Sequence, residues 1–147
     1  MFDELKKITA RASKLDINEV LYEIWQGEDV QELIIELNTR AQLYEQGIDS
    51  KEKDLGEYAP FTIEQKKIAG LPFDRITLFQ TGEFYTSFYV RPRVDGFEIV
   101  ANPVKEDGNL FDDFGEDIVG LTQSSLEQLS KTVLTYIILQ VEKRLTT

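Results

Sequence analysis

The reactive side chains of this chain are carboxylates, because the sequence contains 27 Asp and Glu but neither His nor Cys. A zinc site built on His and Cys, a Ser-His or Cys-His nucleophile and a thiolate redox centre are therefore excluded. With this many acids in 147 residues, close carboxylate pairs arise from composition alone, and none is singled out as a glycosidase dyad. A carboxylate-dependent hydrolase would need two acids in one cleft with pKa values driven apart.

Six carboxylates lie close together in one segment: Glu106, Asp107, Asp112, Asp113, Glu116 and Asp117. Carboxylate oxygens bind calcium, but Phe111 and Phe114 stand where an EF-hand loop requires ligands, so we interpret the segment as a solvated acidic loop. Ser50 and Lys53 match a Ser-x-x-Lys pattern within a polar stretch, which we interpret as a turn. The sequence predicts no catalytic residue, no metal ligand and no cofactor.

The formal charge of −11 limits the surfaces that the protein can bind. Nucleic acid and anionic membranes attract cationic surfaces, whereas the Lys and Arg residues are scattered along this chain, so we expect no specific nucleic-acid binding and no membrane binding. Residues 1–7 are charged where a signal peptide would be apolar, and apolar runs reach only three or four residues. We expect a soluble protein in a reducing compartment.

The elements that must position these side chains begin with helices. Apolar residues recur every three or four positions in residues 1–46, as on one face of a helix. Asp16 and Asp29, each followed three residues later by Glu, mark the starts of a second and a third helix, and Gly27 and Gly47 mark their ends. The apolar face of the first helix contains Phe2, Leu5, Ile8, Ala12 and Leu15.

We therefore predict three helices in residues 1–46, with the third the longest. Their apolar faces, together with Trp25, exceed what a small core requires, so one face is a candidate contact to a neighbouring subunit. On that hypothesis, deletion of residues 1–27 leaves a folded monomer that no longer assembles.

Residues 47–73 are predicted to form a loop-rich connector, and residues 74–102 a small antiparallel β-sheet. The runs 75–79, 88–94 and 97–101 are rich in β-branched and aromatic residues, and Asp95-Gly96 is a hairpin signal between the last two. We expect at least three strands.

Residues 121–145 are predicted to form a C-terminal amphipathic helix, in which Ser124 and Glu127 have capping-box spacing. Its apolar stripe contains Leu126, Leu129, Val133, Leu134, Ile137, Ile138, Val141 and Leu145. We expect this stripe to pack on the sheet. Residues 1–147 are then a single α+β domain of N-terminal helices, a small sheet with a hairpin at Asp95-Gly96, and this helix.

Aromatic residues concentrate near the predicted sheet. If residues 84–89 are extended, Tyr85 and Tyr89 lie opposite Phe84 and Phe88, and they are candidate interface aromatics, as is Trp25. The alternative interpretation is that these residues belong to the core and its edge.

The order of polar motifs along residues 44–145 resembles the phage virion-morphogenesis family, the tail-completion or neck proteins of tailed phages. A turn with Gly and Asp leads to a Pro-x-Thr step followed by Lys, and later to Thr-Gly-x-apolar-x-x-Ser. A Phe-Gly and a Gly-Leu-Thr step then precede the last helix. The matching residues here are Pro60, Thr62, Lys66, Thr81, Gly82, Phe84, Ser87, Phe114, Gly115, Gly120, Leu121 and Thr122.

This resemblance implies a non-enzymatic structural protein of a virion, assembled in the host bacterial cytoplasm as a homo-oligomeric ring at the neck, head-tail connector or tail end. Its partners are then itself and the neighbouring neck and tail proteins of the virion. For the six acids of residues 106–117 we predict a place on the wall of a channel, where like charge keeps DNA from sticking. The alternative is a small acidic binding module or inhibitor that docks onto a basic protein.

Overall fold

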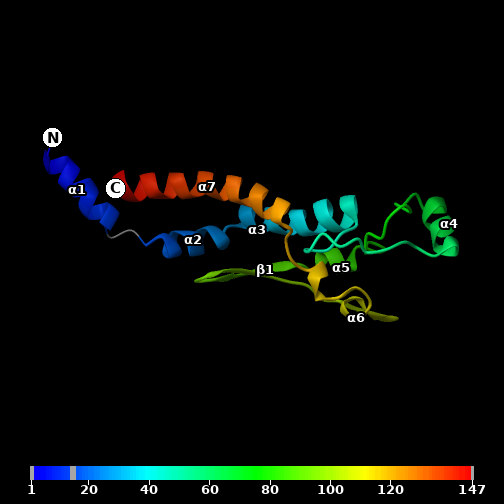
Figure 1. Ribbon diagram of the computed structural model, residues 1–147. Helices are drawn as coiled ribbons and strands as arrows, with labels where there is room; N and C mark the ends of the chain where they lie inside the picture. Colours follow the sequence, from blue (N-terminus) through cyan, green and yellow to red (C-terminus); the bar gives the residue numbers. More distant parts are fainter. Residues whose placement is uncertain (1, 14–15, 147) are drawn as a thin grey trace.

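The computed structural model of this chain describes residues 2–13 and 16–146. Its elements are, in chain order, α1 (Phe2–Ser13), α2 (Ile17–Trp25), α3 (Glu28–Glu36), the π-helix η1 (Leu37–Gln46), α4 (Pro60–Ile68), α5 (Glu83–Thr86), β1 (Tyr89–Arg93), β2 (Gly96–Val100), β3 (Val104–Lys105), β4 (Gly108–Asn109), α6 (Leu110–Phe114), the 3-10 helix η2 (Glu116–Ile118) and α7 (Gln123–Thr146). The molecule is elongated, with α1 at one end and α4 at the other (Figure 1).

The N-terminal helices form where the sequence predicts them, except that α3 begins at Glu28 with Gly27 at its N-cap, so Asp29 lies in the first turn and does not cap it. The Asp16 carboxylate accepts a hydrogen bond from the Asn18 backbone N–H at 3.0 Å and caps α2. Helix α3 continues into η1, and this long third helix ends at Gly47, whose φ of 64° requires the left-handed conformation. In the predicted apolar face of α1, the side chains of Phe2, Ile8 and Ala12 and the whole of Leu15 lie outside the described residues.

The α+β class is confirmed, but the sheet is smaller than predicted. Strands β1 and β2 form one antiparallel hairpin, in register from Tyr89 opposite Val100 to Arg93 opposite Gly96, and β3 and β4 form a second, shorter one. Residues 75–79 are not a strand.

Two tyrosines explain why residues 75–79 are irregular. The Tyr58 hydroxyl accepts a hydrogen bond from the Thr77 N–H at 3.2 Å, and the Tyr85 hydroxyl donates one to the Thr77 carbonyl. Leu78 has a φ of 58°, which interrupts an extended backbone. Side chains therefore satisfy the backbone groups that a neighbouring strand would otherwise pair.

Residues 83–86 form the short helix α5 and not an extended segment. Gly82 has a φ of 88°, and the Thr81 hydroxyl accepts a hydrogen bond from the Glu83 N–H at 3.3 Å, as expected for a tight turn at Thr-Gly. Because the segment is helical, Tyr85 is buried together with Phe84, and the prediction that it lies on an interface opposite Phe84 is wrong.

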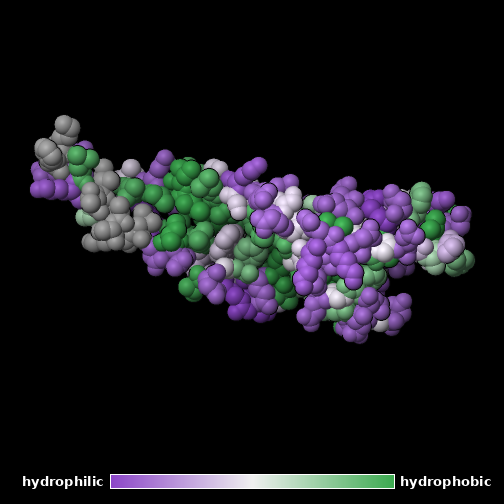
Figure 2. Space-filling model, in the orientation of Figure 1, coloured by the Kyte–Doolittle hydropathy of each residue, from purple (hydrophilic) through white to green (hydrophobic). Residues whose placement is uncertain are grey.

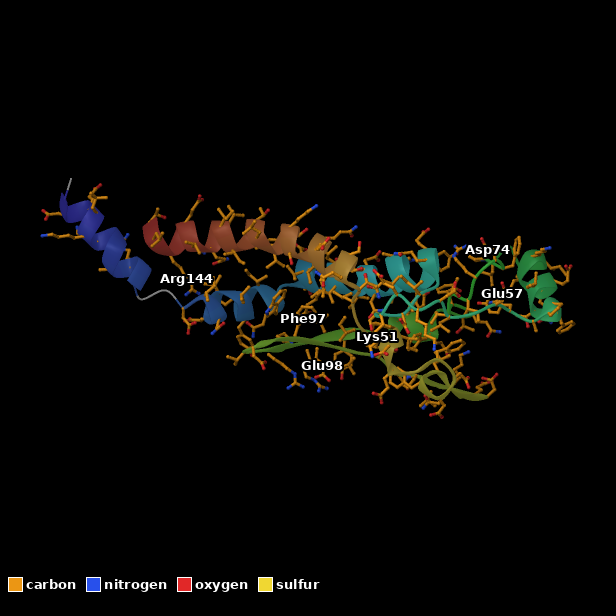
Figure 3. All side chains as sticks on the ribbon, in the orientation of Figure 1. Lys51, Glu57, Asp74, Phe97, Glu98 and Arg144 are labelled. Atoms are coloured by element: carbon orange, nitrogen blue, oxygen red, sulfur yellow. The ribbon has the colours of Figure 1, made fainter. Side chains whose placement is uncertain are left out.

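Helix α7 packs mainly on other helices. It contacts α1, α2 and α3, and α2 and α3 in turn contact the β1–β2 hairpin, so these two helices lie between α7 and most of the sheet (Figure 1). The predicted packing of this helix directly on the sheet is therefore corrected. Figure 3 shows Phe97 on the helix side of the hairpin and Glu98 on its other side.

The core has two parts. One lies between α2, α3, β1 and α7 and contains Val20, Ile24, Ile34, Leu129 and Val133, with Trp25 half-buried beside it. The other lies between η1, residues 76–88 and residues 110–118. Since α2 supplies fully buried residues to the first part, it belongs to the intramolecular core, and the prediction that residues 1–27 are dispensable for folding loses its basis.

Candidate functional site

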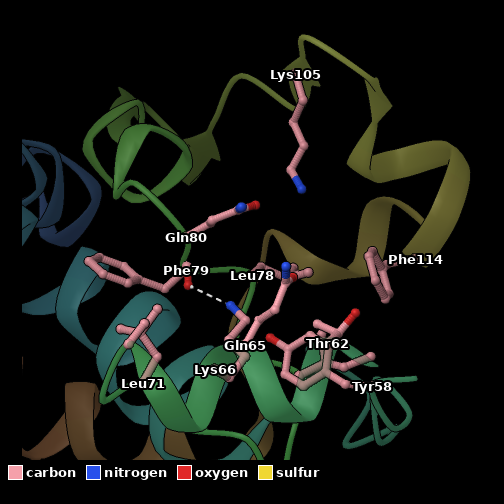
Figure 4. A pocket seen from close by; sticks show the side chains of 12 residues that line it. Tyr58, Thr62, Gln65, Lys66, Leu71, Leu78, Phe79, Gln80, Lys105 and Phe114 are labelled. Carbon is pink, nitrogen blue, oxygen red and sulfur yellow. Dashed lines mark hydrogen bonds between the residues drawn. The ribbon is translucent and has the colours of Figure 1, made fainter. Parts of the chain in front are cut away.

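Seven of the twelve residues that carry the family resemblance line two adjacent cavities beside α4 and α5. A cavity of about 360 Å³ is lined by Thr62, Lys66, Leu78 and Phe114 among others (Figure 4). Phe114 is far from the other three in the sequence. A second cavity, of about 430 Å³, is lined by Thr81, Gly82, Phe84 and Ser87 among others. The two cavities share Leu78, Gln80 and Lys105.

The first cavity has apolar walls and two cations. Its lining residues include Lys66 and Lys105 and no carboxylate. The Lys66 ammonium donates a hydrogen bond to the Phe79 carbonyl at 3.4 Å and lies 5.0 Å from the ring centre of Tyr58, which holds this side chain across the cavity floor (Figure 4). Lys105 reaches in from the second hairpin. These contacts join α4 to the irregular segment before α5.

Pro60, Ser87 and Gly115 have structural roles. Pro60 begins α4, where the missing N–H of Pro is not needed. The Ser87 hydroxyl accepts a hydrogen bond from the Asn102 N–H at 2.9 Å and thereby ties α5 to the segment after β2. Gly115 ends α6 with a φ of 86°, and its N–H donates to the Phe111 carbonyl at 2.8 Å.

Two buried amides that the sequence interpretation missed hold the segment leading into α7. The Asn38 amide donates to the Ile118 carbonyl at 3.0 Å and accepts from the Gly120 N–H at 2.8 Å. The Gln42 amide donates to the Gly120 carbonyl at 2.8 Å and accepts from the Thr122 N–H at 2.9 Å. The signal in the sequence is a pair of amides four residues apart among apolar residues of one helix, which places both on one face.

The Gly120-Leu121-Thr122 step brings the chain close to Ser50 and leads into α7. A Cβ on Gly120 would lie 3.1 Å from the Cβ of Ser50, so a larger residue would require Ser50 to shift. Leu121 packs on the first part of the core. The Thr122 hydroxyl accepts from the Ser125 N–H at 3.1 Å and caps α7, whereas Ser124 lies inside the first turn and is not the cap.

The six acids lie at the end of the molecule that carries β3, β4 and α6. Five are exposed, and Asp117 is paired with Lys51 at 3.2 Å. Within residues 2–13 and 16–146, no group of three or more carboxylates is placed to hold a metal ion. The acidic segment is therefore an exposed anionic surface in the described structure.

Exposed apolar side chains form two separate faces. The arm face, on and after α4, consists of Phe61, Ile68 and Phe73, of which Ile68 is 86% exposed. The helix face, on α7, consists of Leu134, Ile138 and Leu139, each about half exposed. Figure 2 shows apolar side chains gathered over the C-terminal half of α7 and a smaller group at the α4 end.

The helix face corrects the prediction for the C-terminal stripe. Leu129 and Val133 are buried, but Leu134 and Ile138, which the stripe included, point away from the core. Helices α1, α2 and α3 pack on α7, and Leu134, Ile138 and Leu139 remain exposed.

The other candidate interface aromatics differ in environment. Trp25 packs on Phe97 with ring centres 4.9 Å apart and is only partly exposed, so most of its surface is used within the chain. Tyr89 is exposed on β1, where its hydroxyl accepts a hydrogen bond from Arg91 at 3.0 Å.

The buried phenol of Tyr85 should make the free energy of unfolding depend on pH. Burial raises the pKa of its phenol well above the ordinary value of 10.0. The unfolded state then releases this proton at lower pH than the folded state, so the contribution of Tyr85 is complete below pH 10 and is lost as pH rises further. We expect the free energy of unfolding to fall between pH 9 and pH 11, and to fall less steeply in Tyr85→Phe. Urea unfolding at these two pH values measures both slopes, and equal slopes would contradict the prediction.

Comparison with protein-family models, with curated proteins and with solved structures finds no match to this chain. None of the helices in the described residues has the length and apolar character needed to cross a membrane.

Proposed function

We propose that this chain is a non-enzymatic structural protein of a tailed phage or prophage virion, part of the neck, head-tail connector or tail-completion ring. The observation that carries the proposal is the convergence of the motif residues. Thr62 and Lys66 of one motif and Phe114 of another, far later in the sequence, line one cavity, and the Thr81-Gly82 turn lies beside it. Motifs that keep their order along a chain and also meet in space are expected when they serve one structural unit.

The two exposed apolar faces support assembly. They lie on different elements toward opposite ends of an elongated molecule, so neither can cover the other within one chain (Figure 1). Contacts between unlike surfaces of identical subunits close into rings when the rotation between subunits permits. The arrangement therefore supports a homo-oligomeric ring within the virion, bound to neighbouring neck or tail proteins.

For the acidic segment we propose a channel-facing position in such a ring. Glu106, Asp107, Asp112, Asp113 and Glu116 are exposed on one end of the subunit, and their charge would repel passing DNA. A ring in which these side chains face outward, or lie in subunit contacts, would overturn this position.

The same exposed acids favour one alternative function, a small acidic module that docks onto a basic protein. Among the residues that the structure describes, only Asp117 of the six has an ion pair. Such a module would be a monomer or dimer, and its binding would weaken steeply with salt.

The experiment that separates the two is the absolute mass of the purified protein, measured by light scattering across concentration and salt, followed by electron microscopy of any large species. A closed ring supports the virion proposal and shows which residues line its channel. A monomer at every concentration that binds a basic protein in a salt-sensitive way supports the alternative and contradicts self-assembly of the free chain.

A further inference from the structure

We infer that the first cavity is a binding site for an apolar molecule that carries one carboxylate. This is the cavity beside α4 that Lys66 and Lys105 line. Two properties of its wall identify the ligand, namely the apolar surface and the two cations. The inference concerns a ligand site and does not depend on the assembly proposed above.

The cavity has the size and the wall of a small-molecule site. Its volume of about 360 Å³ lies within the range of roughly 300–1,000 Å³ that is typical of ligand cavities in proteins. The wall is mostly apolar, and its apolar residues are Ala69, Leu71, Ile76, Leu78, Phe79 and Phe114. Such a wall favours a ligand with an apolar body, because binding removes apolar surface from water on both sides.

The charged side chains of this wall are cations. Lys66 and Lys105 line the cavity, and no described Asp or Glu does, although the chain has 27 acidic residues against 16 Lys and Arg. Helix α4 turns Gln65 and Lys66 toward the cavity, whereas its Glu64 contacts Lys67 at 3.7 Å. The cavity is therefore locally cationic within an acidic protein, which favours an anionic head group.

Both ammonium groups are available to an anion. Neither Lys66 nor Lys105 forms an ion pair within residues 2–13 and 16–146. An ammonium has three N–H donors, and Lys66 uses one of them for the Phe79 carbonyl. This hydrogen bond and the Tyr58 ring already hold Lys66 in place, so binding costs it little side-chain freedom. A carboxylate has two oxygens, one for each ammonium.

The second cavity differs in charge, although it shares Lys105. Its wall also includes Glu83, Glu106 and Asp107. In the described part of the chain none of these three acids pairs with Lys105, and Figure 4 shows the Lys105 side chain pointing into the first cavity. We therefore expect the anion in the first cavity and not in the second.

The test measures binding of decanoate to the full chain by isothermal titration calorimetry. Decanol has the same apolar body with an uncharged head group, and decyltrimethylammonium has a cationic one. We expect one molecule of decanoate to bind per chain and decanol to bind about tenfold more weakly, because it loses the charged contacts. The cationic amphiphile should not bind.

Three variants and a control locate the site. Lys66→Met and Lys105→Met each remove one charge at nearly constant length, and each should weaken decanoate binding about tenfold. Ala69→Phe places a ring at the wall without a change of charge and should abolish binding. The matched control is Lys131→Met, which removes an exposed lysine of α7 and should leave the affinity unchanged.

The Lys105 variant keeps the test independent of folding. Its side chain makes no hydrogen bond and no ion pair with the described residues, so its removal should leave the circular dichroism spectrum as in the wild type. Lys66→Met also loses the bond to the Phe79 carbonyl, so its spectrum is compared before its affinity is interpreted.

The carboxylate can belong to a free molecule or to the C-terminus of a protein. A short peptide that ends in Phe, compared with its C-terminal amide, distinguishes these sources. Tighter binding of the peptide acid than of decanoate, lost in the amide and in Lys105→Met, would support this site with a protein C-terminus as its ligand. Binding of decanoate without binding of the peptide acid would support a free molecule.

Equal affinities for decanoate and decanol would overturn the inference, as would the absence of decanoate binding at millimolar concentration. Binding that survives Ala69→Phe, or that Lys131→Met weakens as much as Lys105→Met does, would place the anion elsewhere and also overturn it. A monomeric protein that binds decanoate as expected would support the site and contradict self-assembly, whereas a ring without decanoate binding would do the reverse.

Discussion

Replacing Gln42 by Met is expected to lower the free energy of unfolding by roughly 2–6 kcal/mol, because two buried backbone groups lose their partner at a cost of about 1–3 kcal/mol each. These groups are the carbonyl of Gly120 and the N–H of Thr122. Methionine has nearly the same size and shape as glutamine, so the change removes hydrogen bonding with little change of volume.

The control for this variant lies one turn further along the same helix. The Gln46 amide donates to the Ala41 carbonyl at 2.9 Å, but the side chain is exposed, and water can replace the bond. Gln46→Met is expected to change stability by no more than about 0.5 kcal/mol.

Urea unfolding followed by Trp25 fluorescence measures both variants. The midpoint should fall in Gln42→Met with an unchanged denaturant slope, which indicates a change of stability and not of the unfolded state. Equal midpoints for the two variants would show that the amide ladder of Asn38 and Gln42 does not hold the entry to α7.

Deletion of residues 1–27 is expected to unfold the chain at 25 °C, whereas deletion of residues 1–13 should leave a cooperative fold. The longer deletion removes α2, whose Val20 and Ile24 are buried in the core. Burial of these two side chains alone contributes roughly 3–6 kcal/mol, which is comparable with the whole stability of a typical domain, about 5–15 kcal/mol.

Helix α1 is attached differently. It packs on α7, and the Arg11 guanidinium donates to the Leu145 carbonyl at 2.7 Å, but none of its described side chains is buried. No described side chain of α1 belongs to either part of the core, so we expect both parts to persist when residues 1–13 are removed.

Thermal unfolding followed by far-ultraviolet circular dichroism distinguishes the two truncations. Tryptophan fluorescence does not serve for both, because the longer deletion removes Trp25. A cooperative transition in the chain without residues 1–27 would contradict the assignment of α2 to the core. That result would support the hypothesis from the sequence that one apolar face of these helices contacts a neighbouring subunit.

Local signals in the sequence predicted the ends of several elements. Asp16 caps α2, Gly47 ends the third helix and Thr81-Gly82 makes a turn, each through contacts within a few residues, whereas the cap of α7 is Thr122 and not the predicted Ser124. Such signals are readable because a cap or a left-handed turn depends on the identity of one or two neighbouring residues.

The hairpin at Asp95-Gly96 shows that a local sequence signal can identify a hairpin without giving its turn residues and register. The two strands pair as predicted, but Arg93 lies opposite Gly96, so the turn consists of Val94 and Asp95 and Gly96 already belongs to β2. The dipeptide identified the hairpin, and the pairing of the strands determined the register.

Some features of the candidate site were also predicted from the sequence, and others were not. The resemblance placed Thr62 and Lys66 in one motif and Phe114 in another, and nothing in the spacing of the two motifs indicated that they line one cavity. The acids of residues 106–117 were recognised as a group because they are neighbours in the chain. The helix face on α7 was assigned to the core, because a stripe of apolar residues does not reveal how much of it a partner covers.

The amino-acid sequence by itself determined the α+β class, the helix ends and turns, the acidic segment, and the exclusion of His and Cys chemistry. Only the tertiary structure decided that Tyr85 is buried, that residues 75–79 are irregular, and that α2 and α3 separate α7 from most of the sheet. The physical reason is the range of the contacts. Caps and turns are satisfied within one turn of chain, whereas burial and backbone pairing depend on groups far apart in sequence, as Asn38 and Gln42 bonding to residues 118–122 demonstrate.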